Sequence, residues 1–185
     1  MEIFYGYHVV TERPMYLGQH IVFDESHRSG VYQRVKERKE MVEAIYAKPK
    51  EYESIELEYP VVVALRELAL EEVRRENYPQ YPSRLGCLYV SESMQEAEQW
   101  ADYFISLNRP TFQIVKLKVT GCRFVGDATK CFHATIHKDE NLEMAERYWK
   151  NEENSSDHPP IREILVGGDI EVVEIVKEIQ DVSGN

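Results

Sequence analysis

Three short segments of the chain carry the side chains best suited to hold a polar ligand. The segment 7–11, YHVVT, places His8 in a run of β-prone residues. The segment 86–93, GCLYVSES, reads as a strand that turns into a helix, and such a turn offers backbone amides and hydroxyls beside the stacking face of Tyr89. The segment 162–166, REILV, brings Glu163 to the start of an apolar strand.

In this order, the three segments resemble the ADP-ribosyltransferase superfamily, which includes poly(ADP-ribose) polymerases and bacterial DNA ADP-ribosyltransferases, and in particular an uncharacterised bacterial family with that fold. The resemblance implies that His8 contacts the adenosine-side ribose of NAD. It implies that Tyr89, Ser91 and Ser93 wall the nicotinamide, and that Glu163 is the catalytic residue.

The implied substrate, NAD, explains these residue types. Breaking the bond between nicotinamide and ribose builds positive charge on the sugar, which a carboxylate at Glu163 stabilises while it holds the ribose hydroxyl, orients the acceptor or acts as a base. Such preorganised electrostatics contribute several kcal/mol. Arg84, just ahead of the second segment, is expected to bind the pyrophosphate as a bidentate donor.

Each of these residues also has a purely structural interpretation. His8 equally suits a hydrogen-bonded histidine at the end of a sheet. Ser91 and Ser93 are common helix-capping residues. Glu163, taken without the other two segments, suits a solvent-facing position at the start of a strand.

The chain also departs from the pattern of the superfamily. Residues 160–162, PIR, occupy the place where a Gln-x-Glu or Glu-x-Glu turn would precede Glu163, which argues against modification of arginine. The chain lacks the second basic pair that is expected of an RNA 2′-phosphotransferase. The acidic stretch between Gly30 and Tyr78 has no counterpart in the superfamily.

Composition excludes several other classes of protein. A net charge of -11 argues against nonspecific binding to the phosphates of a nucleic acid. No segment approaches the roughly 20 apolar residues of a membrane span. Three cysteines without a CxxC pair, in a chain with no secretory signal, predict reduced thiols in the cytoplasm. Cys131, His133 and His137 lack a fourth zinc ligand, so we expect no metal site.

Periodicity predicts the elements that position these residues. We expect strands over residues 2–11, 21–23, 87–90, 111–120, 122–125, 163–166 and 170–179, with the last two joined in a hairpin by Gly167-Gly168-Asp169. We expect helices over residues 31–46, 61–74 and 141–150 and a helix capped by Ser91 or Ser93, with loops at 24–30 and 151–160.

This pattern predicts one α+β domain over residues 1–185, with a split, mostly antiparallel sheet and a helical pair inserted at 31–78. The resemblance implies that the sheet is of the ADP-ribosyltransferase type. The implied function is NAD-dependent ADP-ribosyl transfer, or NAD hydrolysis, to an acceptor that is a protein, a nucleic acid or a small molecule. Two alternatives stay open: a catalytically silent relative that binds a nucleotide or a protein, and an acidic interaction module for a basic partner.

Overall fold

The computed structural model describes residues 2–23, 29–151 and 161–179. They form two compact units. The sheet unit comprises Met1–Phe23, Leu88–Phe124 and Glu163–Asn185, and the helical unit comprises Asp24–Cys87 and Val125–Arg162. The helical unit is therefore larger than the predicted insertion at 31–78, because a later segment of the chain joins it, while the prediction of a single domain stays a prediction.

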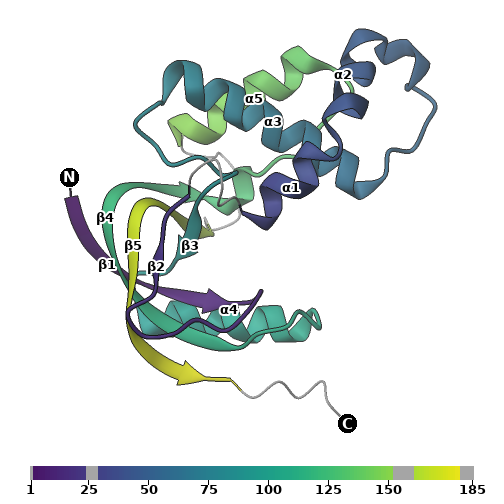
Figure 1. The fold of residues 1–185 in the computed structure, drawn as a ribbon. Coiled ribbons are helices and arrows are strands. Elements are labelled where there is room, and N and C mark those ends of the chain that lie inside the picture. Colours follow the sequence, from purple (N-terminus) through teal and green to yellow (C-terminus); the bar gives the residue numbers. More distant parts are fainter. Residues whose placement is uncertain (1, 24–28, 152–160, 180–185) are drawn as a thin grey trace. The chain divides into compact units, whose positions relative to one another are not determined.

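The sheet unit is built on an antiparallel sheet with the order β1-β4-β5-β2, and β3 also pairs with β5. The mostly antiparallel α+β pattern predicted from the sequence is confirmed. The strands, shown in Figure 1, are β1 (Glu2–Val10), β2 (His20–Ile21), β3 (Leu88–Val90), β4 (Gln113–Asp127) and β5 (Arg162–Glu178).

Two predicted interruptions of these strands are wrong. Gly121 does not separate two strands, and Gly167-Gly168-Asp169 does not form a hairpin, because β4 and β5 each run on through their glycines. The glycines instead allow the two backbones to approach closely. A Cβ built on Gly121 would lie 2.1 Å from the carbonyl oxygen of Gly167, and Gly168 has a φ of +112°, which side chains rarely adopt. Glycine here serves close contact between strands rather than a turn.

Helix α4 (Met94–Ser106) packs against one face of the sheet near the end of β1. Its small residues Ala97 and Ala101 lie against Val9 and Ile114. The helix begins at Ser93, whose side chain accepts a hydrogen bond from the amide of Glu96, while the Glu96 carboxylate accepts from the amide of Ser93. This capping box confirms the prediction that a serine caps this helix.

The helical unit differs from prediction in its first helix. The predicted helix over residues 31–46 is two helices, because the amide of Arg38 bonds to the carbonyl of Val35 and tightens the last turn of the first one. The unit contains α1 (Gly30–Lys36), α2 (Lys39–Ala47), η1 (Pro49–Glu51), α3 (Tyr59–Asn77), η2 (Ala128–Lys130) and α5 (Lys138–Lys150).

The core of the helical unit lies where α3 packs against α5 and α1, as Figure 1 shows. Leu65, Leu70, Tyr148 and Trp149 are almost fully buried there. The predicted loops fall largely on residues 24–28 and 152–160, which lie outside the described residues. No helix in the described part of the chain is both long and apolar enough to cross a membrane.

Candidate functional site

Two of the three predicted motif segments meet in the C-terminal half of β1. The Nδ1 atom of His8 lies 2.7 Å from the carbonyl oxygen of Tyr89, although 81 residues separate them. One step along β1, the amide of Tyr7 donates to the carbonyl of Ser91, and the amide of Ser91 donates to the carbonyl of Tyr7, both at 2.8 Å. The backbone of segment 86–93 is thereby held against the strand that carries His8.

The third segment reaches the same place through β5. In the antiparallel pairing of β3 with β5, Tyr89 lies opposite Leu165 and Val90 lies opposite Ile164. The pairing of β3 with β5 ends at Val90, so Glu163 lies one residue beyond the last paired residue of β5, and Ser91 pairs with Tyr7. Segment 162–166 thereby lies beside segment 86–93.

The side chains of these residues differ in their exposure to solvent. Tyr89 is 38% exposed, so part of its ring faces solvent, whereas Ser91 and Glu163 are buried. Because the amide and carbonyl of Ser91 are both bonded to Tyr7, Ser91 would contact a ligand through its hydroxyl. Ser93 accepts the capping hydrogen bond of α4, so its structural interpretation is confirmed.

The surroundings of His8 favour the neutral form of its imidazole. Burial lowers the pKa of His8 below its ordinary value of 6.5; the hydrogen bond to Tyr89 and the charge of Glu12 act in the opposite direction, and Arg109 adds to the lowering. The imidazole is therefore neutral at pH 7. Because a carbonyl oxygen only accepts hydrogen bonds, Nδ1 carries the proton and Nε2 presents a lone pair. Such an atom accepts a hydrogen bond from a hydroxyl group.

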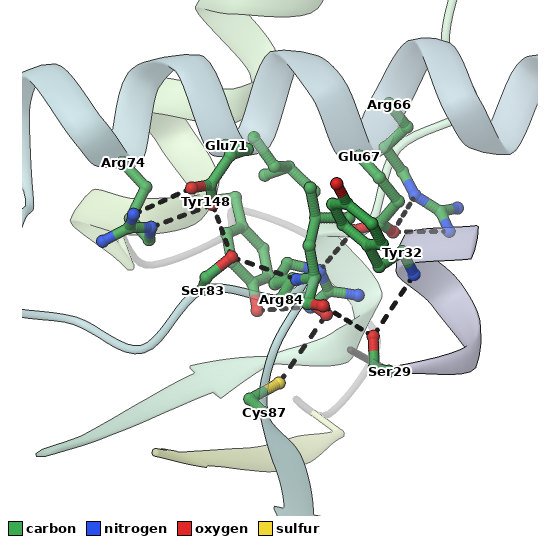
Figure 2. A network of polar contacts seen from close by, with 12 residues as sticks. Ser29, Tyr32, Arg66, Glu67, Glu71, Arg74, Ser83, Arg84, Cys87 and Tyr148 are labelled. Carbon is green, nitrogen blue, oxygen red and sulfur yellow. Dashed lines mark hydrogen bonds and ion pairs between the residues drawn. The ribbon is translucent and has the colours of Figure 1, made fainter. Parts of the chain in front are cut away.

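Arg84 belongs to the helical unit, where it lies in a buried polar network (Figure 2). Its Nε donates to Glu67 at 2.9 Å and its Nη1 donates to the hydroxyl of Tyr148 at 2.6 Å. The guanidinium also lies over the Tyr148 ring, 5.1 Å from its centroid. Only 6% of Arg84 is exposed, so we leave it out of the candidate ligand site.

The same network ties α3 to the segment that precedes β3. The Nε of Arg66 donates to Glu67 at 3.1 Å. Glu71 accepts two hydrogen bonds from Arg74 and one from Ser83 (Figure 2). Every buried side-chain nitrogen and oxygen of the described residues that is fully shielded from solvent has a hydrogen-bond partner, as a stable buried network requires.

The ionisation of Glu67 depends on its two arginines. Burial by itself raises the pKa of this carboxyl, but Arg84 and Arg66 together outweigh burial, and the pKa lies below its ordinary value. Sequence reasoning missed Glu67 and Tyr148 as partners of Arg84. A signal was present, because Glu67 lies among the buried apolar positions of α3, where a lone carboxylate would be costly without a cation.

The described residues contain no group of three or more histidine, cysteine or acidic side chains arranged to hold a metal ion. Cys87, Cys122 and Cys131 form no disulfide bond. The sulfur of Cys87 makes a weak contact with the carbonyl of Arg84 at 3.8 Å.

Comparison with known proteins assigns the chain to a family. No curated protein matches the chain. A family model described as "Protein of unknown function (DUF2441)" matches residues 6–178, a range that includes His8, Tyr89, Ser91 and Glu163, all of the helical unit and most of the sheet unit. The chain belongs to the DUF2441 family.

Proposed function

We propose that the sheet unit binds NAD and transfers its ADP-ribose to water or to another acceptor, with Glu163 as the catalytic residue. The observation that supports this proposal is the strand pairing that holds the segments of His8, Tyr89 and Ser91 together in the sheet unit and ends one residue before Glu163. These four residues are among those that the resemblance to ADP-ribosyltransferases assigns to the substrate.

Each residue suits a different part of the substrate. The lone pair on Nε2 of neutral His8 suits a ribose hydroxyl, which donates a hydrogen bond. The exposed part of the Tyr89 ring suits stacking on the nicotinamide, a planar cationic ring. The hydroxyl of Ser91 suits a polar substituent of that ring, and Glu163 lies next to Ile164, the residue of β5 that pairs with Val90.

The proposed reaction follows from the charge of NAD. When the bond between the nicotinamide nitrogen and the ribose breaks, its electron pair leaves with nicotinamide, which becomes neutral, and positive charge passes to the sugar. The Glu163 carboxylate stabilises that charge where it develops. The oxygen of water, or of another nucleophile, then bonds to the ribose carbon and gives up its proton.

The test combines calorimetric titration with NAD and a nicotinamide-release assay on the wild type, on Glu163→Gln and on Glu174→Gln. Glu174 is the matched control, because it lies on the same strand but is exposed. We expect NAD binding by all three proteins and a loss of release of at least about 100-fold in Glu163→Gln alone. Circular dichroism checks that each variant is folded.

The other outcomes are equally informative. Binding without release by the wild type would leave a nucleotide-binding module that is catalytically silent. The absence of binding at millimolar NAD would contradict the assignment of the site. An equal loss of release in Glu174→Gln would contradict the role of Glu163 in particular.

A further inference from the structure

Arg109, in the turn between α4 and β4, is an exposed cation of the sheet unit. The proposed substrate contains a diphosphate, and its four candidate residues include no cation. Arg84, which the sequence suggested for this role, lies in the buried network of the helical unit. Lys177 of the sheet unit is already paired with Glu98 at 2.8 Å. Arg109, by contrast, forms no ion pair with a carboxylate of the described residues.

Two contacts orient the guanidinium of Arg109. Its Nη2 donates a hydrogen bond to the hydroxyl of Thr11 at 2.9 Å, and its Cζ lies 4.7 Å from the centroid of the Phe104 ring. An arginine side chain has five N–H groups, and within the described residues only Thr11 accepts a hydrogen bond from this one. The guanidinium can therefore donate to two oxygens of one ligand. Because it is already oriented, it loses little conformational freedom on binding.

Arg109 lies at the end of β1 that is closer to His8. Thr11 directly follows β1 and is three residues from His8, about 10 Å along an extended chain. The amide of Phe112 donates to the carbonyl of Val10 at 2.8 Å, so the turn that carries Arg109 lies just beyond this end of the strand. The positive charge of Arg109 also lowers the pKa of His8, as expected of side chains that lie near each other.

We propose that Arg109 binds the diphosphate of NAD beside the ribose that His8 contacts, an inference that rests on the proposed function. A single methylene group joins that ribose to the diphosphate, so a ligand held at His8 has its phosphates nearby. Phosphate oxygens accept two parallel hydrogen bonds from a guanidinium, which fixes the orientation of the ligand and adds affinity. Glu12, whose charge also reaches His8, forms no ion pair with Arg109 in the described part of the chain.

Calorimetric titration with ADP and with adenosine tests this assignment, because only ADP carries the diphosphate. We expect Arg109→Gln to weaken ADP binding at least about tenfold, the loss typical of one hydrogen bond to a charged group, and to leave adenosine binding unchanged. Circular dichroism checks that the variant is folded.

The matched control is Arg123→Gln. Arg123 is also an exposed arginine of the sheet unit, and its Cζ lies 5.4 Å from the centroid of the Phe4 ring. It lies near the other end of β1, because Gly121 pairs with Glu2. The variant loses the same charge at a distant place, so we expect it to bind both ligands like the wild type.

A second measurement tests the position of Arg109 without any ligand. In an NMR titration, the pKa of His8 should rise in Arg109→Gln, because a neighbouring positive charge is lost, and should stay unchanged in Arg123→Gln. Equal ADP affinities of the wild type and Arg109→Gln, equal effects of the two arginine variants, or an unchanged pKa of His8 in Arg109→Gln would overturn the inference.

The results also separate this inference from the proposed function. Nicotinamide release that depends on Glu163, together with full ADP affinity in Arg109→Gln, would overturn the role of Arg109 alone. ADP binding that depends on Arg109, without any release of nicotinamide from NAD, would support the diphosphate site and contradict the catalytic proposal. The absence of ADP binding by the wild type at millimolar concentration would overturn the diphosphate site.

Discussion

Replacing Glu67 by glutamine tests how the helical unit tolerates its buried charges. The variant keeps the shape of the side chain but removes the negative charge that faces Arg84. The Glu67 and Arg84 side chains are only 3% and 6% exposed, so the arginine cannot turn to water. Arg66, the second donor to Glu67, is 18% exposed and can move toward solvent.

The cost therefore comes mainly from Arg84. Removing one partner of a buried ion pair leaves an uncompensated charge and typically costs about 3–5 kcal/mol. We expect a loss of this size in the free energy of unfolding of the helical unit. At the usual dependence of stability on urea, that loss lowers the unfolding midpoint by roughly 2 M.

The assay is urea unfolding at pH 7, followed by the fluorescence of Trp149 in a Trp100→Phe background. Trp149 is buried in the helical unit, and Trp100 is the other tryptophan of the chain, in the sheet unit. This background reports one unit, which matters because two units need not unfold together.

The matched control is Glu143→Gln, which breaks an exposed ion pair with Arg147 on α5 of the same unit. Exposed pairs of this kind contribute about 0.5 kcal/mol or less. A difference below about 1 kcal/mol between Glu67→Gln and Glu143→Gln would refute the reasoning from burial.

The pH dependence gives a second check of the same reasoning. The pKa of Glu67 is lower in the folded state than its ordinary value, so its contribution to stability is complete above the unfolded pKa of about 4.3 and disappears as the pH falls through the folded pKa. The difference between the wild type and Glu67→Gln should therefore shrink below about pH 4.

Four further predictions concern single positions in the two units. Tyr148→Phe removes the hydroxyl that accepts a hydrogen bond from Nη1 of Arg84, and it should lower the free energy of unfolding by about 1.5–3 kcal/mol in the same assay. A loss under about 0.5 kcal/mol would contradict a hydrogen bond to the charged guanidinium. Under the proposed function, calorimetry should show that the NAD affinity of the wild type falls as the pH drops through the pKa of His8, which burial holds below 6.5, and His8→Asn should abolish this pH dependence. Gly121→Ala should destabilise the sheet unit by at least about 2 kcal/mol, because its Cβ would clash with backbone. Gly18 has a φ of +78°, but a Cβ built on it would meet no atom within 4 Å. Gly18→Ala should therefore lower the free energy of unfolding, measured by tryptophan fluorescence, by only about 1 kcal/mol.

Local pattern was sufficient for much of the secondary structure. The run of β-prone residues in β1 and the serine that caps α4 are signals confined to a few residues, and the structure has both elements where these signals predict them. Such elements follow from the backbone and side chains of one segment, so they require no knowledge of distant parts of the chain.

Glycine was misread for the opposite reason. Gly121 and Gly167-Gly168 carry the local signature of turns, yet they lie inside the long strands β4 and β5. These glycines allow the two strands to approach closely, although more than 40 residues of sequence separate them. A contact between segments so far apart in the sequence leaves no signal in the residues around each glycine.

By itself, the sequence determined the α+β class and the antiparallel bias of the strands. It also named the candidate residues, which are His8, Arg84, Tyr89, Ser91, Ser93 and Glu163. Only the tertiary structure decided which of its polar residues meet. It joined β1 to the segment after β3, and it placed Arg84 in a buried pair with Glu67. The physical reason is that hydrogen bonds and ion pairs depend on distances between atoms, which the chain sets only when distant segments pack together.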